Sequence, residues 1–187
     1  MSESDFTNLR IFFPITFLRL EFAEKNKYIF GCLVFSVFSS IVFYFLPVKP
    51  SLIINDGILN DIQDLCAILF PFLVASLVAV STLSRDGLDD RTVGSPVKIN
   101  VKHQGLVSLS RREFVCVMFS FSAMVCFLIF LSILISKIFA KSFVGVLPYE
   151  YVDLAKSFYF LFFSFMFSVL TVFTFWGMYY VSYKIFR

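Results

Sequence analysis

The sequence predicts an all-α integral membrane protein with four transmembrane helices and a small cytoplasmic β-hairpin between the second and the third. Hydrophobic residues make up 59% of the 187-residue chain, against about 45–50% in an ordinary soluble domain. Four long uncharged runs alternate with polar connectors, and the Lys and Arg residues gather in every second connector. A bilayer, unlike water, tolerates an outer surface this apolar.

The four uncharged runs each reach the length of about 20 apolar residues that a helix needs to cross the hydrocarbon core. The fourth is the longest, so it is expected to tilt or to extend beyond the bilayer. The chain then divides into an N-terminal interfacial segment (1–27), a first span (28–46), an external loop (47–64), a second span (65–84), a cytoplasmic connector (85–112), a third span (113–136), an external loop (137–156), a fourth span (157–183) and a cytoplasmic tail (184–187).

The positive charges predict the orientation. Twelve of the sixteen Lys and Arg residues lie in the N-terminal segment, the second connector and the tail. Cytoplasmic loops carry the excess of Lys and Arg in membrane proteins, so both termini are expected in the cytoplasm.

The N-terminal stretch Phe6–Phe22 is apolar but contains Arg10 and Arg19. With Pro14 as its first helical residue, it is interpreted as a helix lying on the inner leaflet. A cytoplasmic extension of the first span explains the same pattern, and the sequence leaves both open.

The cytoplasmic connector carries the strand pattern. Val97–Lys102 alternates apolar and polar residues with period two, His103–Gly105 is a turn, and Leu106–Leu109 is a second strand. Such a sequence predicts a β-hairpin. Because an isolated hairpin is marginal in water, it needs lipid headgroups, a second copy or a partner to pack on.

Short sequence patterns predict where three of the helices begin. Asn60 with Gln63 is expected to cap the second span, and Ser110 with Glu113 forms a capping box before the third. Tyr149–Lys156 is expected to be a short helical lead-in to the fourth span.

Residues for catalysis, cofactors or metals are not found together in the sequence. The four cysteines fall inside apolar runs, His103 is the single histidine, and no Gly-rich phosphate loop is present. The spans contain no ionisable residue of the kind that marks pumps and transporters. We therefore predict that the chain is not an enzyme and binds no cofactor.

Small and hydroxyl-bearing residues recur one turn apart on three spans. They are Ser36 with Ser40, Ala75 with Ala79, and Ser164 with Ser168 and Thr171. Small residues let membrane helices approach closely, so Ser164, Ser168 and Thr171 are predicted to pack helices, within one subunit or in a homo-oligomer, most simply a tetramer. A hydroxyl-lined pore is the sharper alternative.

The four uncharged runs, the basic connector and the chain length resemble the KwaA family, the membrane subunits of the Kiwa anti-phage defence system. The resemblance lies in the architecture of the whole chain and no motif carries it. It implies a homo-oligomeric sensor of phage infection in the bacterial inner membrane that recruits a soluble partner, KwaB, on its cytoplasmic side.

The expected function is thus a scaffold or sensor that binds itself, the lipid bilayer and a cytoplasmic effector protein, with no direct nucleic-acid binding. The alternative is a pore-forming effector that depolarises the inner membrane. The basic residues of the connector and one apolar strand residue form the predicted partner site: Lys98, Ile99, Lys102, Arg111 and Arg112.

Overall fold

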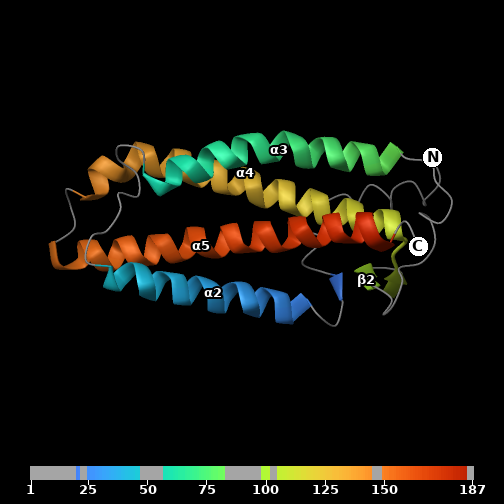
Figure 1. Cartoon of the computed structure of the whole chain (residues 1–187), viewed down its shortest axis with the longest axis horizontal. Helices are drawn as coiled ribbons and strands as arrows, with labels where there is room; N and C mark the ends of the chain where they lie inside the picture. Colours follow the sequence, from blue (N-terminus) through green and yellow to red (C-terminus); the bar gives the residue numbers. More distant parts are fainter. Residues whose placement is uncertain are drawn as a thin grey trace. The chain divides into compact units, whose positions relative to one another are not determined.

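Four long helices dominate the computed structural model (Figure 1), which describes residues 20–21, 25–46, 57–82, 98–101, 105–144 and 149–184. Each of the four is long and apolar enough to cross a membrane. This confirms the helical class and the prediction of four helices with the length and composition of membrane spans. The helices are α2 (Lys25–Phe45), α3 (Ile58–Thr82), α4 (Arg111–Val144) and α5 (Tyr149–Tyr179), which continues into the π-helical turn η2 (Tyr180–Lys184).

Two helices extend beyond the predicted spans. Helix α3 begins at Ile58 rather than at residue 65, and α4 continues to Val144 rather than ending at residue 136. Hydropathy locates the hydrocarbon core, whereas backbone hydrogen bonding continues into the polar interface. The predicted cap at Asn60 is wrong, because α3 begins two residues earlier, at Ile58, and the Asn60 N–H donates to the Gly57 carbonyl, 2.7 Å away.

The other two helix starts are as predicted. The Ser110 N–H donates to Glu113 Oε2 at 2.9 Å, and the Glu113 N–H donates to Ser110 Oγ at 3.3 Å, which confirms the capping box. Helix α5 begins at Tyr149, which confirms the helical lead-in. Its 31 residues correspond to roughly 45 Å at about 1.5 Å per residue, longer than a hydrocarbon core of about 30 Å.

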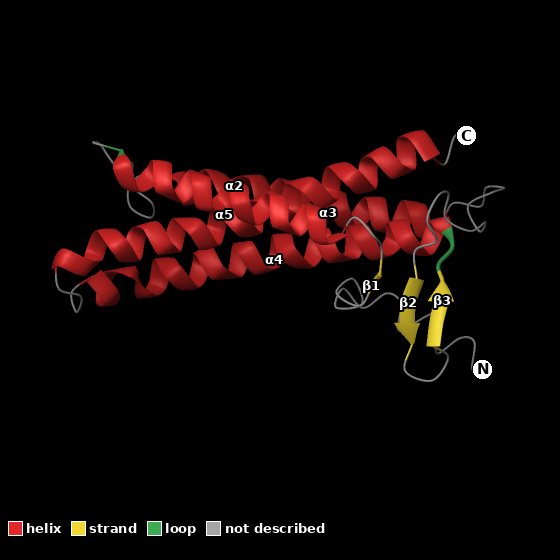
Figure 2. Ribbon diagram, turned by 90° about the horizontal axis from the view of Figure 1, so that it is seen from below, coloured by secondary structure: helices red, strands yellow, loops and turns green. Residues whose placement is uncertain are grey.

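Three short strands form one antiparallel sheet in the order β1-β2-β3 (Figure 2). Strand β1 is Leu20–Glu21, β2 is Lys98–Val101 and β3 is Gly105–Ser108. The register places Ile99 opposite both Leu20 and Val107. Residues 102–104 lie outside the described residues.

The strand at β1 corrects the interpretation of the N-terminal segment. Leu20 and Glu21 were expected in a helix, but they pair with Ile99 and Lys98. An unpaired edge of β2 offers backbone donors and acceptors that a second extended segment satisfies. The rest of the predicted interfacial helix, residues 6–19 and 22, lies outside the described residues.

The chain divides into two compact units. Unit 1 comprises residues 1–28, 71–124 and 172–187, and unit 2 comprises residues 29–70 and 125–171. The sheet belongs to unit 1, together with the first turn of α2, the end of α3, the start of α4 and the end of α5. Helix α3 passes from one unit to the other at Pro71, which has no N–H to donate to the carbonyl of Ala67.

Burial differs sharply among the helices. In the most apolar window of α4, 67% of the residues are buried, against 22% in α2, 17% in α3 and 33% in α5. In unit 1 every residue from Phe114 to Phe119 is buried, so this part of α4 is packed on all sides. The buried residues of α3 recur every seventh position, at Leu59, Cys66, Leu73 and Val80, which is the spacing of a single narrow packing seam.

Candidate functional site

The described residues of the predicted partner site lie on two elements of unit 1, β2 and α4, with β3 between them in the chain. Lys98 and Ile99 lie in β2, while Arg111 and Arg112 form the first residues of α4 and are half-buried. Lys102 lies outside the described residues. The register places Lys98 opposite Glu21 and Ser108, so β2 is the central strand and has neighbours at both of its backbone edges.

The junction between the sheet and α4 is short and anchored. Leu109 follows β3 directly and is 1% exposed. Ser110 then begins the capping box, and its carbonyl accepts a hydrogen bond from the Phe114 N–H at 3.0 Å. Because the apolar anchor and the cap are adjacent, the end of β3 is fixed to the start of α4.

An aromatic cluster joins three helices of unit 1. The rings of Tyr28 and Trp176 lie 5.1 Å apart, those of Phe114 and Trp176 lie 5.7 Å apart, and those of Phe114 and Tyr180 lie 5.0 Å apart. The start of α2, the start of α4 and the end of α5 therefore meet in edge-on and tilted ring contacts. Aromatic residues at a predicted membrane boundary were the signal for this cluster, which the sequence analysis missed.

Helix α5 also approaches α4 closely at a glycine. A Cβ atom built on Gly177 would lie 3.3 Å from Cε1 of Phe119, tighter than most real contacts of a Cβ. Gly31 on α2 has no such neighbour within 4 Å. Of these two glycines, only Gly177 is required for helix packing.

Several hydroxyl groups of the spans bond to a carbonyl of their own helix. Ser36 donates to the Cys32 carbonyl at 2.7 Å, Ser136 donates to Ser132, and Thr171 donates to the Phe167 carbonyl at 2.8 Å. This arrangement satisfies a hydroxyl without water or a partner helix. It leaves the Thr171 hydroxyl less available to line a pore.

One hydroxyl bond crosses between helices. Ser40 Oγ donates to the Ser157 carbonyl of α5 at 2.9 Å, and the rings of Phe43 and Phe160 stack nearby with centroids 4.5 Å apart. Ser40 therefore joins α2 to α5 within one subunit. Ser164 and Ser168 of the predicted oligomer surface are half-buried on α5.

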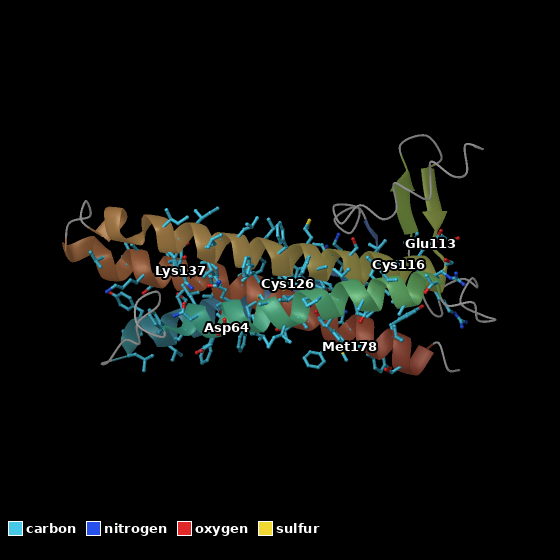
Figure 3. All side chains as sticks on the ribbon, turned by 90° about the horizontal axis from the view of Figure 1, so that it is seen from above. Asp64, Glu113, Cys116, Cys126, Lys137 and Met178 are labelled. Carbon is cyan, nitrogen blue, oxygen red and sulfur yellow. The ribbon has the colours of Figure 1, made fainter. Side chains whose placement is uncertain are left out.

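Contacts between α3 and α4 in unit 2 are of three kinds. The Cys126 thiol donates to the Cys66 carbonyl at 3.4 Å, the Lys137 ammonium donates to the Gln63 side-chain oxygen, and the rings of Phe70 and Phe127 lie 5.9 Å apart. Cys126 and Lys137 are labelled in Figure 3. These contacts fix the register of the two helices.

Within the described ranges, no three His, Cys, Asp or Glu side chains lie close enough together to hold a metal ion. The residues of unit 1 form a small sheet that is attached to the densely packed start of α4.

Comparison of the chain with protein-family models, curated proteins and solved structures finds no match.

Proposed function

We propose that this protein is a membrane-embedded scaffold or sensor subunit that recruits a cytoplasmic effector. The observation that carries the proposal is the sheet of unit 1, in which Leu20–Glu21 from the N-terminal segment pairs with Lys98–Val101 of the connector. Two segments far apart in the sequence thus form one small sheet. This sheet is attached through Leu109 to α4, the most buried of the four described spanning helices. Such an element can pass a binding event on one side of the membrane to the packed helices.

The sheet also suits recognition of a protein. Strand β3 forms an outer edge of the described sheet, and an edge strand can pair with an extended segment of a partner. We take the connector to act as a cytoplasmic β-hairpin in this role. Its Lys and Arg residues would speed the encounter with an acidic partner surface.

The cytoplasmic location of this element rests on charge. The N-terminal segment, the connector and the tail hold twelve of the sixteen Lys and Arg residues, which favours the cytoplasmic face of a bacterial inner membrane. The architectural resemblance to KwaA makes anti-phage defence the biological setting, with phage infection as the signal and KwaB as the effector.

Self-association is the second part of the proposal. Large apolar side chains remain exposed on α2 and α3, for example Phe35, Phe38 and Ile68. Lipid covers such faces in a monomer, and a second copy can replace part of the lipid. We propose a homo-oligomer, in which Ser164 and Ser168 of α5 serve as close-packing positions.

The test is co-purification of cytoplasmic proteins from detergent-solubilised membranes, at matched levels of each variant. Ile99→Asp, and Lys98→Glu combined with Lys102→Glu, are expected to abolish recruitment without changing membrane insertion. Lys156→Glu, a charge reversal near the start of α5, is the control and should keep the partner. Unchanged recovery with both connector variants would contradict the proposed docking site.

A pore-forming effector is the second candidate. The half-buried hydroxyls of Ser164 and Ser168, one turn apart on α5, are the observation that favours it. Planar-bilayer recordings with purified protein distinguish the two candidates. Steady conductance that Ser168→Leu abolishes would support the pore, and a silent bilayer at the same protein density supports the scaffold.

A further inference from the structure

Two cysteines of unit 2 face each other across α3 and α4. Cys66 is 1% exposed and Cys126 is 0% exposed. The Cys126 thiol donates to the Cys66 carbonyl at 3.4 Å. No disulfide joins the two cysteines in this structure.

The helices hold the pair in position from both sides. Along α3, the Gln63 contact to Lys137 lies one turn before Cys66, and the Phe70 contact to Phe127 lies one turn after it. A disulfide needs Cβ atoms about 3.5–4.5 Å apart. Since the Cys126 sulfur lies 3.4 Å from the Cys66 carbonyl oxygen, rotation of the two side chains would bring the sulfurs together.

The surroundings decide which oxidant reaches the pair. The thiols lie in the apolar part of both spanning helices, away from water-soluble oxidants. Their chain neighbours Leu65 and Phe127 are 44% and 46% exposed on the apolar surface. Each cysteine is therefore next in the chain to a residue on the face that lipid covers, and a lipid-soluble oxidant would approach from that face.

We propose that Cys66 and Cys126 are a redox pair, which a membrane-soluble quinone oxidises to a disulfide between α3 and α4. One S–S bond forms and two S–H bonds break. The pair loses two electrons and two protons, and the quinone takes them up at its two carbonyl oxygens to become the hydroquinone. No other reactant is needed.

The consequence concerns the least buried helix. In the most apolar window of α3 only 17% of the residues are buried, so its position depends on few contacts. A disulfide joins it covalently to α4, the most buried helix. The oxidation state of the membrane quinones would then set how freely α3 moves, whatever partner the protein recruits.

The experiment counts free thiols in the full-length protein. Reduced protein in lipid nanodiscs is treated without oxygen with duroquinone, whose fully methylated ring cannot add a thiol. The sample is then denatured and labelled with a polyethylene-glycol maleimide, which retards the protein on a gel once per free cysteine. Wild type is expected to lose two of its four reactive cysteines, and dithiothreitol should restore both.

Variants assign the loss to this pair. Cys66→Ala and Cys126→Ala should show the same labelling before and after quinone, as should Cys66→Ser if alanine impairs insertion. Cys116→Ala is the matched control, because Cys116 is equally buried on α4, and it should still lose two thiols. Wild type that keeps all four thiols, or a Cys66→Ala variant that still loses two, would overturn the proposal.

Discussion

Helices α3 and α4 pack against each other in unit 2, yet their environments are opposite. Both are apolar enough to cross a membrane, but 17% of the residues in the best window of α3 are buried against 67% in α4. Helix α3 buries one narrow seam, whereas α4 is buried on every side from Phe114 to Phe119. Hydropathy therefore identifies a span without telling whether its surface meets lipid or protein.

The difference in burial between α3 and α4 also means that large apolar residues contact lipid on α3 and pack against protein on α4. Phe72 on α3 is 51% exposed, and Phe114 on α4 is 2% exposed and contacts the rings of Trp176 and Tyr180. In a membrane, lipid is as apolar as a side chain, so burial against protein stabilises mainly through close packing. Three paired substitutions test this comparison.

The largest effect is expected from truncating the two phenylalanines. Phe114→Ala leaves a cavity among packed rings and should lower the free energy of unfolding by about 3–5 kcal/mol. Phe72→Ala, on the face that lipid covers, should change it by less than about 0.5 kcal/mol. SDS titration of each variant in mixed micelles measures both. Equal losses would mean that α3 and α4 are packed alike.

Valine substitutions at a matched pair of glycines are expected to change stability by a smaller amount. A Cβ at Gly177 would lie 3.3 Å from the Phe119 ring, so Gly177→Val should push α5 away from α4 and destabilise by about 1–3 kcal/mol. Gly31→Val meets open space and should change stability by less than about 0.5 kcal/mol. The same titration tests the pair, and a Gly177→Val protein as stable as wild type would refute the close approach.

The smallest change in stability is expected from alanine substitutions of two serines of α2. Ser40→Ala removes the hydrogen bond to the Ser157 carbonyl and should cost about 0.6 kcal/mol, typical of such bonds between membrane helices. Ser36→Ala removes a bond within its own helix and should cost less, because the Cys32 carbonyl keeps its backbone donor. A double-mutant cycle with Phe160→Ala should show coupling for Ser40 alone. Coupling of equal size at Ser36 would contradict the assignment.

The sequence predicted the elements that follow from local rules. Uncharged length identified the four spans, and the Ser110–Glu113 spacing identified the start of α4. The start of α3 was misplaced because the second span was taken to begin after Asp64, although a helix tolerates exposed carboxylates near its N-terminus. The extension of α4 past Lys137 was missed because its partner, Gln63, belongs to another helix.

Long-range pairings could not be predicted from one sequence. Leu20 and Glu21 carry no strand signal of their own, and their conformation depends on the edge of β2. In the predicted partner site, Lys98 and Ile99 were placed in a strand, but the neighbour at β1 was not foreseen. Likewise, the Ser36 and Ser40 spacing indicated a packing face, while only the fold shows that α5 covers it.

The central proposal is that four helices cross the membrane with both chain ends on the cytoplasmic side. Fusions of alkaline phosphatase, active only outside the cytoplasm, and of green fluorescent protein, fluorescent only inside, test it most directly. Fusions after Gly94 and Arg187 should be fluorescent, and fusions after Asp56 and Gly145 should have phosphatase activity. A fluorescent, phosphatase-inactive fusion after Asp56 would contradict the four-span topology.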